Sequence, residues 1–157
     1  LVYYKDFVQI KNSLGKDTIG ILKFYFTDGD GDIGLKSSGN PDEFNLFIDY
    51  YEFSDGQFRK VPYNAYKDTI INGDTIKVFD KVDTVNYNTR IPDLGVSGNN
   101  KSIKGDTEVE IMTNIRLRDT VYYEFYMVDK TDHKSNVAAT PAIILYWKDI
   151  KAEWIKT

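Results

Sequence analysis

The chain has 157 residues, of which 20 are Lys or Arg and 24 are Asp or Glu, so its formal net charge is −4 at pH 7. No basic cluster offers a nucleic-acid footprint, and no apolar run approaches the roughly 20 residues that a membrane-spanning helix needs. The absence of cysteine excludes disulfides, thiolate metal sites and cysteine nucleophiles. The length suits one domain over residues 1–157, with 148–157 as an appended tail.

The composition favours β-structure. The sequence contains 12 Tyr, 9 Phe and 2 Trp, which is heavy aromatic usage for a chain of modest hydropathy. Aromatic and β-branched side chains fit the pleated, half-buried surface of a sheet, and almost no stretch shows a helical period. We therefore expect an all-β fold.

The N-terminal part predicts two strands. Residues 3–15 are typical of an edge strand followed by a turn. Residues 19–27 predict a second strand, in which Leu22, Phe24 and Phe26 share one face. We expect this face in the core.

Hairpins are predicted in the middle of the chain. A strand at 44–53 turns back into 58–61, and a second hairpin spans 68–79. This second hairpin is centred on Asn72-Gly73, the strongest short-range hairpin signal.

Four more strands are expected after these hairpins, at 83–91, 108–112, 120–128 and 135–146, the last with a bend at Pro141. The clearest is 120–128, where Val121, Tyr123, Phe125 and Met127 share the expected core face. The tail from residue 147 to 157 fits either a short helix or a strand.

Three segments carry a family resemblance. They are FYFTDGDGDIGL at 24–35, FNLFIDYYE at 44–52 and YEFYMVDKTDHKSNVAATPAIIL at 123–145. They resemble uncharacterised exported lipoproteins of Bacteroides-type bacteria. The resemblance implies an immunoglobulin-like or fibronectin-III-like antiparallel β-sandwich, here enlarged by extra hairpins between 55 and 91. It also implies an exported lipoprotein at the outer membrane, cell surface or periplasm, with the signal peptide and lipidated Cys upstream of residue 1.

The clearest hint of site chemistry is an acidic loop after the second strand. Asp28, Asp30 and Asp32 alternate there with small residues. Calcium takes six to eight oxygen ligands, and alternating aspartates can present several carboxylates to one point. If the strands 19–27 and 120–128 end at the same pole, Asp129 and Asp132 supply further ligands. These five aspartates are the predicted calcium site.

The known calcium loops match this segment only in part. The EF-hand pattern places Gly where Ile33 stands and an acid where Gly39 stands, and the integrin-type pattern places an acid at Lys36. The alternative interpretation is a turn whose acids are solvated, because Gly and Asp are both favoured in turns.

No catalytic residue is predicted. His133 is the only histidine and lies in a polar turn, and Gly95-Val96-Ser97-Gly98 falls short of a Gly-x-Ser-x-Gly elbow. A glycosidase needs only two carboxylates, but sequence cannot choose a pair among 24 acids. A two-carboxylate glycoside hydrolase is therefore the least favoured alternative.

Tyrosines on two predicted strands suggest a binding surface for a sugar or a partner, namely Tyr50, Tyr51, Tyr122 and Tyr126. The alternative is that they cover a second packing layer. Six Asp-Thr pairs, five of them followed by Ile or Val, fit strand starts after turns. The family resemblance also implies O-glycosylation at such triplets.

We therefore expect a non-catalytic, exported lipoprotein domain that binds or scaffolds an envelope protein or glycan and takes calcium as its only candidate cofactor. A carbohydrate-binding module is the main alternative. This functional expectation rests on the resemblance and on no identified site.

Overall fold

The computed structural model describes residues 1–29, 43–91, 103–113 and 118–146. All regular elements in these segments are β-strands, and every strand pair is antiparallel. The all-β prediction is confirmed. No helix able to span a membrane occurs in these segments. The predicted tail at 148–157, with its short helix, lies outside the described residues.

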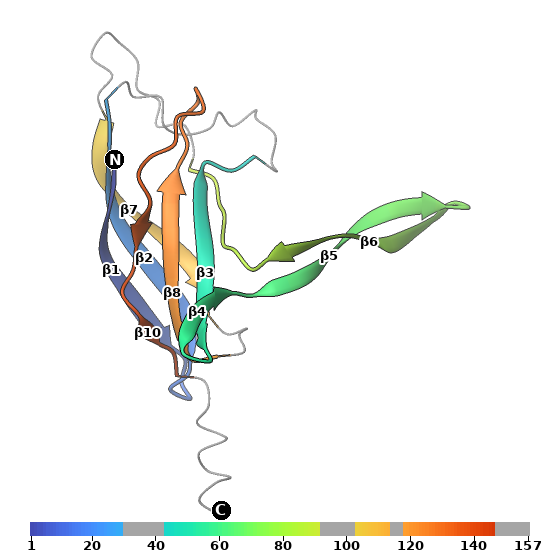
Figure 1. Ribbon diagram of the computed structural model, residues 1–157, viewed down its shortest axis with the longest axis horizontal. Helices are drawn as coiled ribbons and strands as arrows, with labels where there is room; N and C mark the ends of the chain where they lie inside the picture. The colour runs from blue at the N-terminus through green and yellow to red at the C-terminus, as the bar shows by residue number, and fades with distance from the viewer. Residues whose placement is uncertain (30–42, 92–102, 114–117, 147–157) are drawn as a thin grey trace, which may run out of the picture.

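The first sheet has three strands, β1 (Val2–Lys11), β2 (Asp17–Asp28) and β7 (Ile103–Met112), in the order β1-β2-β7 (Figure 1). β1 is an edge strand, as predicted. The buried carboxylate of Asp17 accepts hydrogen bonds from Gln9 Nε2 and from the backbone N–H of Tyr146, which ties the β1–β2 hairpin to the last described residue.

The second sheet has the order β10-β8-β3-β4, with β9 paired to β8. These strands are β3 (Leu46–Ser54), β4 (Gln57–Lys60), β8 (Thr120–Met127), β9 (Ala138–Ala139) and β10 (Ile143–Ile144).

The strand expected at 135–146 with a bend at Pro141 is regular only in part, because only β9 and β10 pair regularly with β8. Between them Pro141 has no N–H to donate, and the side chain of Thr140 accepts a hydrogen bond in place of a backbone carbonyl. Its hydroxyl accepts a hydrogen bond from Tyr123 N–H at 3.1 Å.

The expected strand at 83–91 is likewise only partly regular. Residues 83 and 84 belong to β6 (Asp74–Thr84), and the chain after them follows β3 through isolated contacts. Tyr87 N–H donates to Ile48 C=O and Thr89 N–H donates to Leu46 C=O, each at 2.9 Å.

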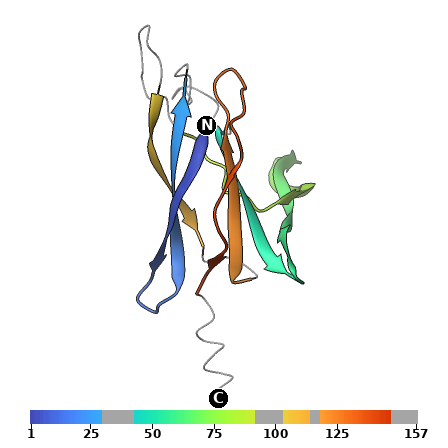
Figure 2. The same cartoon turned by 60° about the vertical axis from the view of Figure 1, so that its left-hand side comes forward.

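The two larger sheets, called the body here, face each other and enclose the core (Figure 2). All seven residues predicted for the core from the two clearest strands are at most 5% exposed, namely Leu22, Phe24, Phe26, Val121, Tyr123, Phe125 and Met127. Phe24 and Phe125 join the sheets directly, with ring centroids 5.2 Å apart. The two-residue alternation therefore located the core correctly.

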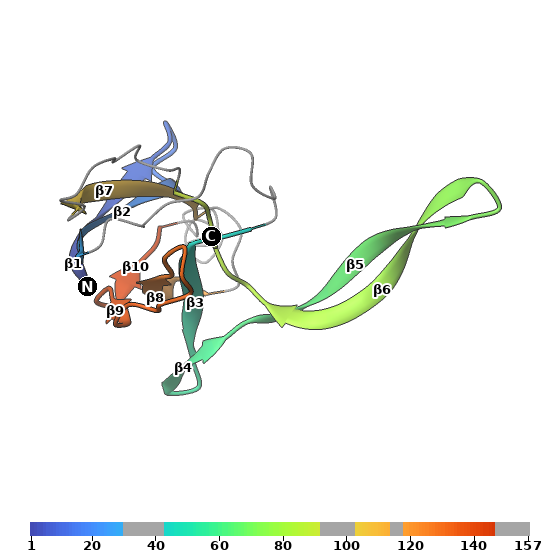
Figure 3. The ribbon, with the colours of Figure 1, turned by 90° about the horizontal axis from the view of Figure 1, so that it is seen from above.

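A third sheet has two strands only, β5 (Pro62–Ile71) and β6, and it projects from the body as an arm (Figure 3). Its turn contains Asn72 and Gly73 with φ of 51° and 83°, the left-handed pair that a tight hairpin turn requires. The arm, residues 62–84, is longer than the predicted hairpin at 68–79. At its base, Val85 N–H donates to Val61 C=O at 2.8 Å.

Candidate functional site

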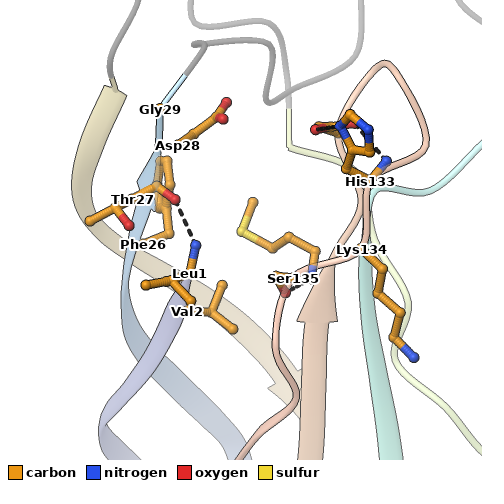
Figure 4. A pocket seen from close by; sticks show the side chains of 11 residues that line it. Leu1, Val2, Phe26, Thr27, Asp28, Gly29, His133, Lys134 and Ser135 are labelled. Carbon is orange, nitrogen blue, oxygen red and sulfur yellow. Dashed lines mark hydrogen bonds and ion pairs between the residues drawn. The ribbon is translucent and has the colours of Figure 1, made fainter.

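Two acidic segments meet at one pole of the body. The end of β2 and the turn after β8 line a shared pocket of about 190 Å³ (Figure 4). Asp28 reaches it from the first sheet, and Asp129 and His133 reach it from the second. The amide of Asn136 holds this pole together, because it bonds both the N–H and the C=O of Val2 at 2.8 and 2.9 Å.

The carboxylate of Asp129 organises its own turn. Its Oδ1 accepts hydrogen bonds from the backbone N–H groups of Thr131 and His133, at 2.9 and 2.8 Å, and from the Thr131 hydroxyl. Burial alone would raise the pKa of Asp129, but these hydrogen bonds hold it below its ordinary value. Asp129 Oδ2 lies 3.2 Å from His133 Nδ1.

The predicted calcium ligands are brought together only in part. Asp28 and Asp129 line the same pocket, whereas Asp132 is absent from its lining. Asp30 and Asp32 lie outside the described residues. Within the described segments no three Asp, Glu or His side chains gather to hold a metal ion. The calcium site therefore stays a prediction.

His133 does not have the geometry of a catalytic base between a nucleophile and an acid. Both the Thr131 hydroxyl, at 3.1 Å, and Asp129 contact the same ring nitrogen, Nδ1. In a triad the acid and the nucleophile bond opposite nitrogens of the ring. The side chain of His133 is 76% exposed, so its contacts stabilise a surface turn.

The outer face of the second sheet carries a second candidate site. Its centre consists of three rungs of directly opposed residues on β3 and β8, which are Phe47–Tyr126, Asp49–Glu124 and Tyr51–Tyr122. The rings of the two aromatic rungs are stacked, with centroids 5.1 and 4.6 Å apart. An acidic rung thus lies between two aromatic rungs.

Glu124 is held by the two tyrosines beside it. The hydroxyls of Tyr51 and Tyr122 donate to its two carboxylate oxygens, each at 3.1 Å. Burial, followed by the hydrogen bond and charge of Glu124, raises the pKa of Tyr51. The pKa of Tyr122 is raised by the same causes. Both hydroxyls therefore remain donors throughout the neutral range.

Two lysines lie against this face. Lys60 Nζ is 3.4 Å from the Asp49 carboxylate and 5.6 Å from the centre of the Tyr51 ring, and Lys134 Nζ is 4.0 Å from that of Tyr126. The three outer tyrosines were named from sequence, but Tyr50 lies in the core and is 2% exposed. Sequence reasoning missed the acidic rung. The alternation Phe47-x-Asp49-x-Tyr51 places Asp49 on the face of the two aromatic residues, but only the register with β8 sets Glu124 opposite it.

The arm was also missed as a functional element. Its register places opposed residues on a common side, and one side carries the rungs Tyr66–Phe79, Asp68–Lys77 and Ile70–Thr75. We call these six residues the Tyr66 face. The sequence does carry a signal of this arrangement. Apolar and charged residues occur at both the odd-numbered and the even-numbered positions of β5 and β6, so neither face of the arm is purely apolar or purely polar.

In comparisons with known proteins, no family model, no curated protein and no solved structure matches the chain.

Proposed function

We propose that the chain is a non-catalytic module of the cell envelope that binds or scaffolds another macromolecule. In this proposal the body is an immunoglobulin-like β-sandwich, and a lipid anchor attached upstream of residue 1 holds it at the membrane. Two antiparallel sheets around a common core support the sandwich. The contacts of His133 and Asp129, which serve a turn, support a non-catalytic role.

The observation that carries a binding role is the arm. Its two strands pair only with each other among the described strands. Isolated two-stranded hairpins are at best marginally stable in water, and contiguous exposed apolar surface marks interaction sites. Tyr66, Ile70 and Phe79 are 58%, 74% and 55% exposed on one side of it. A chain that projects such a ribbon is suited to contact a partner.

Site-specific photo-crosslinking in intact envelopes tests this role. A photoreactive phenylalanine analogue at Ile70 is expected to give adducts of discrete mass. The same analogue at Ile144, which is 58% exposed on the body, is the matched control. Equal labelling from both positions, or none from Ile70, would contradict the proposal. Fatty-acid labelling of the natural full-length product tests the anchor.

We further propose that calcium stabilises the acidic pole through Asp28, Asp30, Asp32, Asp129 and Asp132. Oxygen ligands from two sheets would then be joined by one ion, which binds the folded chain only. Millimolar calcium is expected to raise the melting temperature, and Asp30→Asn with Asp32→Asn is expected to abolish the rise. An unchanged melting temperature of the natural sequence would refute this part.

A second candidate function is carbohydrate binding by the outer face. The flanking aromatic rungs and the acidic rung of Asp49 and Glu124 favour it, since sugars combine stacking on rings with hydrogen bonds to carboxylates. Affinity electrophoresis in gels that contain polysaccharides is the test. Retardation lost in Tyr51→Ala and kept in Phe79→Ala would support it, and silence across a glycan array would exclude it.

A further inference from the structure

We propose that Asn72, in the turn of the arm, is a site of spontaneous deamidation. The modification needs water as its only co-reactant, and it goes beyond the proposed binding function. Asn72 is the only asparagine of the chain that is followed by glycine. Because glycine has no Cβ, the backbone nitrogen of Gly73 can be approached more closely by a neighbouring side chain than that of any other residue type.

The reaction joins the side chain of Asn72 to the backbone of Gly73. The backbone nitrogen of Gly73 attacks Asn72 Cγ, a nitrogen–Cγ bond forms, and the bond between Cγ and Nδ2 breaks. Nδ2 leaves as ammonia and takes the proton that the Gly73 N–H has lost. Water then opens the cyclic succinimide at either carbonyl, which gives aspartate or isoaspartate at position 72. The loss of ammonia and the gain of water together raise the mass by about 1 Da.

Both reacting groups are accessible in the structure. Asn72 and Gly73 are exposed and form the tight turn between β5 and β6. Within the described residues, the side chain of Asn72 makes no hydrogen bond and the N–H of Gly73 donates to no acceptor. A Cβ added to Gly73 would have nothing within 4 Å. No contact outside the turn therefore obstructs the attack.

Most other asparagines are held by their side chains. Five of the seven in the described segments bond backbone groups, namely Asn12, Asn45, Asn86, Asn88 and Asn136. The attack would have to break these bonds. Asn64 has no such side-chain bond among the described residues, but it lies within β5 and is followed by Ala65. Asn64 is therefore an internal reference in the same arm.

The fold of the arm favours the reaction. The turn must open briefly, because Asn72 has to rotate until its Cγ meets the neighbouring nitrogen. Among the described strands β5 and β6 pair only with each other, and the turn lies at the end of the arm remote from the body (Figure 3). Two-stranded hairpins are marginally stable, and local opening is most frequent where few contacts hold a segment. The rate therefore depends on opening of the arm and not on unfolding of the body.

Isoaspartate at position 72 would change the arm. Its backbone runs through Cβ and Cγ and is one carbon longer than that of asparagine, whereas the tight turn requires two ordinary residues. The rung Ile70–Thr75 is the part of the Tyr66 face nearest the turn. The new carboxylate also lies two residues from Asp74, which is exposed. Deamidation is thus expected to loosen the strand pairing near the turn.

Peptide mapping by mass spectrometry tests the site. The natural chain is incubated in mildly alkaline buffer beside a synthetic peptide of residues 68–77, which shows how fast the isolated sequence reacts. Asn72 is expected to gain about 1 Da at least about tenfold faster than Asn64. Asn72→Asp is the matched control, because Asp-Gly also suits the turn but has no amide to lose. A folded chain unchanged at Asn72 after the peptide has converted, or equal gains at Asn64 and Asn72, would overturn the inference.

Hydrogen exchange tests the consequence for the arm. Aged chains that carry isoaspartate at position 72 are expected to exchange the amides of β5 and β6 faster than fresh chains. The amides of β2 and β8 are expected to keep their rates, because the body does not depend on the turn. Unchanged exchange in the arm of the modified chain would reject the effect on strand pairing.

Discussion

The body and the arm are built from the same kind of strand, yet they hold their shape in different ways. In the body, β2 and β8 each alternate between one buried and one outward face. In the arm, no residue of β5 or β6 is buried. Burial of one face therefore stabilises the body, whereas the arm depends on a tight turn, backbone pairing and cross-strand contacts. The following predictions test that contrast, from the largest expected effect to the smallest.

Phe125→Ala should cause the largest loss. Phe125 is fully buried and packs on Phe24 across the core, so its removal leaves a cavity. We expect the free energy of unfolding to fall by about 3–5 kcal/mol. Urea denaturation followed by tryptophan or tyrosine fluorescence measures it. A loss below about 1 kcal/mol would mean that the core is less well packed than this contact indicates.

Gly20→Ala should cost about 1–3 kcal/mol, because the body has no room at this position. A Cβ on Gly20 would collide with the ring of Phe7, which stacks on Tyr123 at 5.3 Å. Gly105, in the neighbouring strand of the same sheet, has nothing within 4 Å of an added Cβ. Gly105→Ala is therefore the matched control, and equal losses at the two glycines would contradict the close approach.

Asp129→Asn should lower the free energy of unfolding of the body only at pH values at which the natural carboxylate is ionised. The pKa of Asp129 is lowered from 3.8, so its ionised form is the one that folding stabilises. Its contribution is complete above pH 3.8 and disappears as the pH falls through the lower folded value. We expect the natural chain to be about 1 kcal/mol more stable than the variant at pH 6, with the gap closing in acid. A stability difference that grows as the pH falls would contradict this prediction, because folding would then favour the protonated form of Asp129.

Phe79→Ala should have the smallest effect on the body. Phe79 is 55% exposed and its ring contact is with Tyr66 inside the arm. We expect the free energy of unfolding of the body to change by no more than about 0.5 kcal/mol. The pair Phe79→Ala and Phe125→Ala thus compares one substitution in two settings, and similar losses would show that the arm and the body unfold as a single unit.

Much of the body could be predicted from the sequence, because alternation over nine or more residues reports a half-buried strand. That signal located the core faces of β2 and β8, whereas the dipeptide Asn72-Gly73 located the turn of the arm. Alternation was less informative at 135–146, where a threonine side chain and the proline of the expected bend interrupt regular pairing. Asp-Thr pairs start strands at Asp17 and Asp74 but lie inside strands at Asp68 and Asp106, so they are weak markers.

The candidate sites were harder to predict, because they depend on which segments the fold brings together. The calcium hypothesis required the strands before Asp28 and Asp129 to end at the same pole, and these two aspartates do line one pocket. The Asp49–Glu124 rung depends on the register between β3 and β8, which no local pattern determines. The arm projects because, among the described strands, β5 and β6 pair only with each other, which a sequence pattern cannot report.

The hydrogen bond between Val85 and Val61 has a consequence for how this molecule can vary. The arm leaves and re-enters the body between two residues that are already paired, at 2.8 Å. Its length can therefore change without shifting any strand of the body. Adding two residues to each strand would lengthen the reach by about 7 Å and keep every side chain on its face, whereas adding one would invert both faces. The arm can therefore be lengthened or shortened in steps of two residues per strand without changing which side chains lie on each face.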